Sequence, residues 1–139
     1  MRWVSSLVPL SFYFCDNRQD ADACATLVVK GIKQATAPSL WWFDKHKENR
    51  PEVIDYHIIT KWDGTPVAVI LTTAVLVIPF GQVDVGFAYA EGEGDRSLVQ
   101  WQEVHRAYYS REMGCEANKI ANDFTVVCHR FQTFFCALS

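Results

Sequence analysis

The stretch that most restricts how this chain can fold is residues 90–97, Ala-Glu-Gly-Glu-Gly-Asp-Arg-Ser, which alternates glycine with acidic residues. Glycine loses more backbone freedom on folding than any other residue, so two glycines in a short segment lower stability. They are useful where the chain needs a positive φ angle or where backbone passes close to another group. Ser97 and Gln100 then match a capping box at the start of an amphipathic run. The sequence therefore predicts a glycine-rich acidic loop that leads into a helix N-terminus, where backbone N–H groups point outward.

The length and charge of the chain exclude several classes of protein. With 139 residues, 50% hydrophobic and 21% charged, the chain is expected to form a single domain, residues 1–139, with a substantial core. The 14% aromatic content is explained by core packing, and it also suggests aromatic surface in a pocket. A net charge of -3 and a pI of about 5.7 argue against duplex DNA as a partner. No stretch approaches the roughly 18 apolar residues of a membrane span, so no membrane partner is expected.

The cysteines and histidines do not follow a metal-binding or disulfide pattern. The five cysteines are odd in number and include no Cys-x-x-Cys, and the four histidines lack ligand spacing. We therefore expect free thiols, no metal, no cofactor and a cytoplasmic location. The apolar start, residues 1–15, faintly resembles a signal peptide, but Pro9 interrupts it and no small-residue cleavage site follows, so we expect no leader.

Hydrophobic periodicity and turn signals predict mixed secondary structure. An apolar stripe ending at Lys30 and Gly31 predicts a first helix over residues 20–30. Asp63-Gly64 lies between two apolar runs and is typical of a β-hairpin. The other predicted elements are β-like segments at 32–36, 56–61, 67–73, 75–78 and 124–135, a short helix at 83–90, and a helix from Ser97 to about Glu112. This order predicts an α+β fold without parallel βαβ units.

Residues 40–43 form an aromatic run, Leu-Trp-Trp-Phe, which we expect to be extended. The polar stretch that follows, residues 44–51, is expected to be an exposed loop. Neighbouring side chains of a strand point to opposite faces, so Trp41 and Trp42 cannot both point inward. One tryptophan could line a groove, or it could pack against the first helix. The residues alone leave both interpretations open.

Two motifs resemble a known family. Gly31-x-Lys33-x-x-Thr36 is similar to the G-x-K-x-x-T signature of ASCH domains, and residues 87–98, followed by Trp101 and His105, are similar to the longer members. The resemblance extends from about residue 14 to residue 135, and it implies a PUA-like β-barrel flanked by helices. The chain departs from the pattern where Pro38 and Gln102 stand in place of arginines.

Lys33 is the leading candidate for chemistry. A lysine in a mostly apolar segment is partly desolvated, which lowers its pKa and makes it usable as a base or nucleophile activator. Thr36 could present its hydroxyl nearby, and Glu91 or Glu93 could carry a proton. The resemblance implies that this group hydrolyses an amide of an N4-acylated cytidine, or that it acts in a ribonuclease with Lys33 stabilising phosphate charge. The structural alternative is a salt bridge between Lys33 and a glutamate.

Further candidates concern ligand binding. Asp95, Arg96 and Ser97 could form a polar cradle at the helix entrance, or they could serve as ordinary caps. Gly31 belongs to the same candidate pocket as the first motif. The expected partners are RNA or a modified nucleoside. As an alternative to catalysis, the domain could be an RNA-binding module in which Trp41 or Trp42 stacks on a base.

Overall fold

The computed structural model describes residues 10–136. The expectation of no leader concerns residues 1–15, most of which lie outside this range. Five strands form one mixed sheet in the order β1-β3-β4-β5-β2. Their bounds are β1 (Leu10–Phe12), β2 (Ala35–Thr36), β3 (Tyr56–Thr60), β4 (Pro66–Pro79) and β5 (Thr125–Cys136). The helices are α1 (Arg18–Val29), α2 (Leu40–His46), α3 (Val85–Glu91) and α4 (Leu98–Met113), with single 3-10 turns η1 (Phe80–Gln82) and η2 (Ala117–Lys119).

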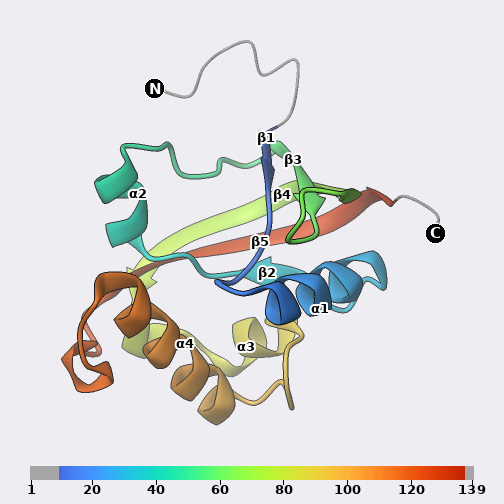
Figure 1. Ribbon diagram of the computed structural model, residues 1–139. Helices are drawn as coiled ribbons and strands as arrows, with labels where there is room; N and C mark the ends of the chain where they lie inside the picture. Colours follow the sequence, from blue (N-terminus) through green and yellow to red (C-terminus); the bar gives the residue numbers. More distant parts are fainter. Residues whose placement is uncertain (1–9, 137–139) are drawn as a thin grey trace.

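The sheet is open among the described residues. Strands β1 and β2 lie at opposite ends of the strand order, and the described pairings do not join them. The α+β class is therefore observed, whereas closure into the expected barrel is not. The long antiparallel pair of β4 and β5 crosses the centre of the molecule in Figure 1, with α1, α3 and α4 on one side. No helix within residues 10–136 is both long and apolar enough to cross a bilayer.

Strand β1 corrects the expectation of a fold without parallel βαβ units. It runs parallel to β3, with Leu10 opposite His57 and Phe12 opposite Ile59. The intervening chain contains α1, β2 and α2. A parallel pair needs such a long crossover connection, so the pairing is set by distant segments and leaves no local turn signal.

Helix α2 corrects the strand expected for the aromatic run. The side chain of Ser39 accepts a hydrogen bond from the backbone N–H of Trp42, which caps the helix, and Lys47 ends it with φ 55°. Trp42 and His46, one helical turn apart, stack with ring centroids 4.4 Å apart. The helix cap and this i, i+4 pair outweigh the β propensity of the aromatic residues.

The predicted first helix, the hairpin and the helix after Ser97 are all present. Asn17 caps α1, whose buried face is Ala21, Cys24, Ala25 and Val28. The turn at Asp63-Gly64 joins antiparallel β3 and β4, with Gly64 at φ 91°. Ser97 caps α4, and Gly114 ends it at φ 70°.

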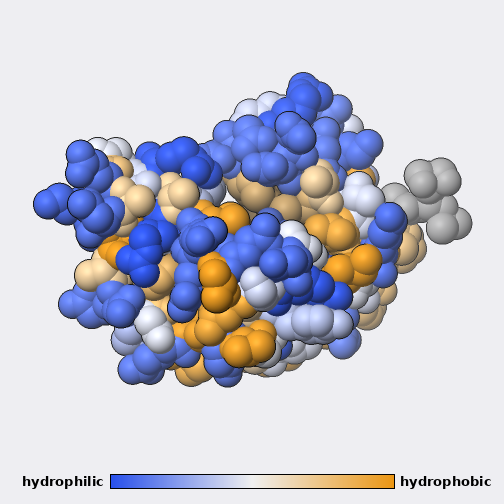
Figure 2. Space-filling model, turned by 90° about the horizontal axis from the view of Figure 1, so that it is seen from below, coloured by the Kyte–Doolittle hydropathy of each residue, from blue (hydrophilic) through white to orange (hydrophobic). Residues whose placement is uncertain are grey.

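Two groups of buried side chains hold the layers together. One joins α3, α4 and one end of β5 around Phe80, Trp101 and Tyr109. The other joins α1 to the sheet around Phe14 and Phe131. The underside that carries the helices shows apolar patches separated by hydrophilic side chains (Figure 2), consistent with exposed Val85 and Val99.

Candidate functional site

The glycine-rich loop lies against the segment that carries Lys33. Helix α3 ends at Glu91, and Gly92 follows in the left-handed region with φ 75°. A Cβ atom on Gly92 would lie 2.7 Å from the backbone oxygen of Ile32, so only glycine allows this approach. The backbone N–H of Gln34 donates to Ala90 O at 2.7 Å, which fixes the two segments together. Both reasons for glycine that the sequence suggested, positive φ and close backbone approach, are confirmed here.

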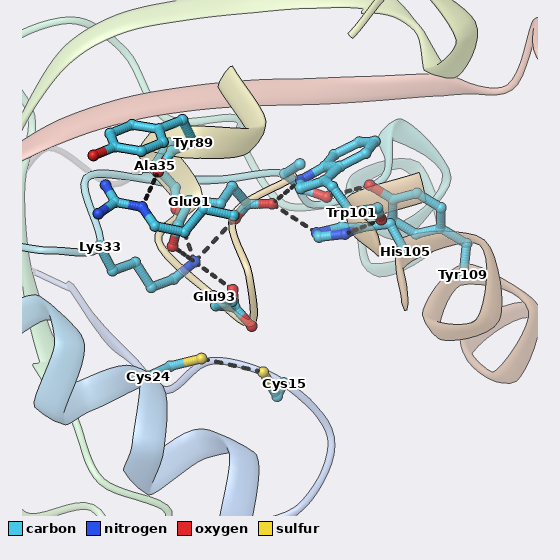
Figure 3. A network of polar contacts seen from close by, with 12 residues as sticks. Cys15, Cys24, Lys33, Ala35, Tyr89, Glu91, Glu93, Trp101, His105 and Tyr109 are labelled. Atoms are coloured by element: carbon cyan, nitrogen blue, oxygen red, sulfur yellow. Dashed lines mark hydrogen bonds and ion pairs between the residues drawn. The ribbon is translucent and has the colours of Figure 1, made fainter. Parts of the chain in front are cut away.

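This contact brings two carboxylates to one buried ammonium. Lys33, with 1% of its side chain exposed, donates to Glu91 Oε1 at 2.9 Å and to Glu93 Oε2 at 2.7 Å. It also donates to the backbone oxygens of Ala35 at 2.8 Å and Glu91 at 3.3 Å. An ammonium has three N–H donors, so four acceptors more than satisfy it. Figure 3 shows the Lys33 nitrogen between the two glutamates.

Glu91 is held from its other side by α4. Its Oε2 accepts from Trp101 Nε1 at 2.5 Å and lies 2.7 Å from His105 Nε2. The His105 Nδ1 atom lies 2.9 Å from the backbone oxygen of Trp101, so both ring nitrogens face oxygen atoms. The two aromatic rings stack with centroids 4.1 Å apart (Figure 3). Trp101 and His105, which the family motif includes and which lie one helical turn apart on α4, both hold the Glu91 carboxylate.

The pKa of Lys33 is shifted in the direction opposite to the expected one. Burial by itself lowers the pKa of the ammonium, but the Glu91 and Glu93 carboxylates outweigh it and raise that pKa above its ordinary value. Burial likewise raises the pKa of Glu91, whereas Lys33 and His105 lower it, and the net pKa is below the ordinary value. The expectation of a lowered lysine pKa is therefore wrong. Lys33 is a protonated, ion-paired lysine rather than a free amine at neutral pH.

A cleft with a volume of about 840 Å³ opens beside this network. Lys33, Thr36, Glu91 and Glu93 all line it, so the four residues expected to carry chemistry share one cavity. Glu93 is the more accessible carboxylate, with 32% of its side chain exposed against 1% for Glu91. The cleft also has a set of aromatic side chains: Phe12, Tyr13, Phe14, Trp42, Phe43, Trp62 and Tyr108.

A neutral histidine forms another part of the cleft wall. His129 is almost fully buried, and its Nε2 lies 2.8 Å from the Thr72 hydroxyl. Burial, with smaller contributions from His57 and Lys33, lowers the pKa of His129 to about 3. The ring is thus uncharged at neutral pH and can exchange hydrogen bonds with a polar ligand. No local motif marks this residue in the sequence.

The remaining candidates for ligand binding lie elsewhere. Asp95 accepts from the backbone N–H of Ser97, and Ser97 caps α4. Of the two interpretations of this segment, ordinary capping is therefore the one observed for these two residues. Arg96 donates to the Tyr89 backbone oxygen at 3.0 Å and lies over the Tyr89 ring. The cleft lining does not include these three loop residues.

Of Gly31, Trp41 and Trp42, one residue, Trp42, belongs to the cleft lining. Trp42 lines the cleft, whereas Trp41 contacts Lys45 and is not part of the lining. Gly31 is exposed at the end of α1 with φ 75°, where its role is to end the helix.

Comparisons of this chain with family models and with solved structures agree with each other. A family model described as ASCH domain matches residues 10–134. The chain is similar to the crystal structure of an ASCH domain from Lactobacillus crispatus JV V101, with 36% identity and a TM-score of 0.82 over 97% of this chain and 86% of that one. It is also similar to protein EF3133 from Enterococcus faecalis V583, with 30% identity and a TM-score of 0.81 over 92% and 77%. No curated protein matches the sequence.

Proposed function

This chain belongs to the ASCH domain family, and we propose that it hydrolyses the amide of an acylated nucleobase or nucleoside, of the N4-acylcytidine type, in the cleft beside Lys33. The observation that carries the proposal is the buried Lys33 ammonium, which joins two carboxylates of unequal exposure at the cleft wall. A buried ion pair contributes little net stability, because desolvation offsets its Coulombic attraction. Its position at a cavity that can hold a small molecule favours a role in chemistry.

The three members of the network would have distinct roles. Glu91, fixed by Trp101 and His105, is a positioning residue that holds the ammonium in place. Glu93 is the partner that a substrate can replace, because it is partly exposed and follows a glycine. A substrate carbonyl oxygen would take its place on Lys33, and the released carboxylate would then be free to accept a proton.

The hydrolysis then balances without a cofactor. A water molecule attacks the amide carbon while Glu93 accepts its proton, and the Lys33 ammonium stabilises the negative charge on the carbonyl oxygen. When the C–N bond breaks, the proton passes from Glu93 to the leaving nitrogen, which yields a carboxylic acid and the free amino group. The Thr36 hydroxyl, on the cleft wall, would orient the water or the substrate carbonyl. Lys33 acts here as an electrostatic stabiliser, because its raised pKa argues against a role as a neutral base.

The direct test is deacylation of N4-acetylcytidine by the purified 139-residue chain, with cytidine and acetate measured by chromatography. Loss of a general base typically lowers the rate by roughly 10²-fold to 10⁴-fold, so Glu93→Gln should reduce kcat/KM by that order. Thr36→Val tests the hydroxyl with little change of volume. Glu103→Gln is the matched control, because Glu103 is exposed on α4 and does not line the cleft.

The result that would refute this function is equally specific. Activity of Glu93→Gln equal to that of the unmodified chain would remove Glu93 from the mechanism. A complete lack of turnover of N4-acetylcytidine and of related N-acylated nucleosides, by a chain with a normal circular-dichroism spectrum, would exclude amide hydrolysis.

Non-catalytic RNA binding is the second candidate, and the aromatic lining of the cleft favours it. Trp42 and Trp62 both line the cavity and could stack on unpaired bases. Titration of a single-stranded RNA oligomer at two salt concentrations would measure this binding. Trp42→Ala should weaken binding by about 1–3 kcal/mol if a base stacks there. Binding without turnover of any acylated nucleoside would favour this candidate over hydrolysis.

A further inference from the structure

A second chemical group borders the same cleft on the side of α1. Cys15 and Cys24 place their sulfur atoms 3.7 Å apart, and both are free thiols. The two sulfur atoms and a carboxylate oxygen of Glu93 all lie within 4.8 Å of one another. Figure 3 shows Glu93 between the Lys33 nitrogen and the thiol pair. Three potential metal ligands therefore converge from three separate segments.

The fold, and not a local motif, creates this cluster. Cys24 lies on the buried face of α1, and Cys15 lies in the connection between β1 and α1. Cys15 has φ 68°, a conformation that non-glycine residues seldom adopt and that is found more often at functional sites. Glu93 arrives from the glycine-rich loop after α3. The expectation of no metal rested on ligand spacing along the chain, whereas these three groups are brought together by the fold.

The sulfur geometry fits a tetrahedral ion. Zinc–thiolate bonds are about 2.3 Å long, so two thiolates on one tetrahedral zinc ion lie roughly 3.8 Å apart. The observed separation of 3.7 Å is close to that value, whereas a disulfide would need about 2.05 Å. Glu93 uses Oε2 to accept from Lys33, and a carboxylate has a second oxygen that can bind a metal.

We propose that Cys15, Cys24 and Glu93 form a zinc-binding site on the wall of the cleft, with the fourth position taken by water. Two thiolates and one carboxylate form a ligand set that suits zinc, and three protein ligands with one open position are typical of reactive rather than purely structural zinc sites. Cys15 and Glu93 line the cleft, so an ion has access from solvent. The site does not rest on the proposed amide hydrolysis.

Binding also leaves the local charge balanced. Zn²⁺ displaces one proton from each thiol, so two positive charges arrive as two leave. Lys33 keeps its contact with Glu91 and can keep its contact with Glu93 Oε2. Binding therefore does not require the buried ion pair to break.

The test uses Co²⁺ as a spectroscopic substitute for Zn²⁺ on the reduced 139-residue chain. One equivalent of Co²⁺ should produce a thiolate-to-metal charge-transfer band in the near ultraviolet and intense visible bands typical of tetrahedral cobalt, and Zn²⁺ should abolish both. Cys15→Ser and Cys24→Ser should each remove or strongly reduce the charge-transfer band. Two variants are used because Cys24 is buried and Cys15 is only half-buried. Cys115→Ser is the matched control, since Cys115 is a half-buried thiol outside the cluster.

Glu93→Gln should lower the zinc affinity by at least about 10-fold while the thiolate band persists, because both sulfur ligands remain. The proposal is overturned if the reduced chain binds no zinc in competition with a chromophoric chelator. It is also overturned if the cobalt spectrum is unchanged in folded Cys15→Ser and Cys24→Ser. Failure of the deacylation assay would leave this result unaffected, because metal binding is measured without substrate.

Discussion

Replacing Lys33 with methionine removes a buried ammonium but keeps an unbranched side chain of comparable length. Lys33 and Glu91 are each 1% exposed, so the Glu91 carboxylate would be left in the interior without this cation. Trp101 and His105 would still contact it, and Glu93, which is 32% exposed, could regain hydration. The loss of stability in Lys33→Met therefore arises mainly from the unpaired, buried charge of Glu91.

The expected magnitude follows from this burial. Removing one partner of a buried ion pair typically costs about 3–5 kcal/mol, which is a large part of the roughly 5–15 kcal/mol that stabilises a domain. Replacing both partners removes the uncompensated charge. The double variant Lys33→Met with Glu91→Gln should therefore recover about 2 kcal/mol or more relative to Lys33→Met alone.

Urea unfolding followed by tryptophan fluorescence measures these differences. A loss of about 3 kcal/mol moves the unfolding midpoint by roughly 1–3 M when the m-value is about 1–3 kcal/mol/M. Lys61→Met, at an exposed position, is the control and should change stability by no more than about 0.5 kcal/mol. The reasoning is refuted if Lys33→Met costs less than about 1 kcal/mol, or if the double variant is no more stable than the single one.

Three further perturbations test the same network. The pKa of Glu91 is lowered to about 2 from an ordinary 4.5, so its ionisation stabilises the fold fully above pH 4.5 and this stabilisation is lost as the pH falls toward 2. The stability of Glu91→Gln, measured by acid unfolding, should therefore depend less on pH between 4.5 and 2. Gly92→Ala should lower the free energy of unfolding by more than about 2 kcal/mol, because its Cβ would meet Ile32 O. Gly31→Ala, at the same φ but with no atom within 4 Å, should lower it by about 1 kcal/mol. Equal losses of stability in thermal unfolding would contradict the close approach at Gly92. Trp101→Phe keeps the ring but removes the donor to Glu91, and chemical denaturation should show a loss of about 1–3 kcal/mol.

Much of the secondary structure could be predicted because its signals are local. Ser97 and Gly114 bound α4, and Asp63-Gly64 marks the hairpin, through contacts within a few residues. The positive φ angle at Gly92 could also be predicted, because glycine adopts this conformation more readily than any other residue. The family resemblance then placed Lys33 and the glutamates in one group.

Errors arose where local signals conflicted or where a distant segment decided the outcome. The run at residues 40–43 has aromatic residues with high β propensity, yet the Ser39 cap makes it helical. Strand β1 forms because β3 offers a parallel partner more than forty residues later, which no turn motif announces. Asp95, Arg96 and Ser97 carry polar groups that bind ligands in some proteins, but here they are occupied by capping and by contacts with Tyr89.

The sequence by itself determined the ends of α1 and α4, the hairpin and the positive φ angle in the acidic loop, because each depends on neighbours along the chain. Only the tertiary structure decided the charge state of Lys33, the place of His105 beside Glu91, and the meeting of Cys15 and Cys24 with Glu93. Electrostatic interactions and metal coordination depend on distances in space between groups that are far apart in the chain. Burial of Lys33 alone would have lowered its pKa, and the sign changed because packing brought two carboxylates within 3 Å.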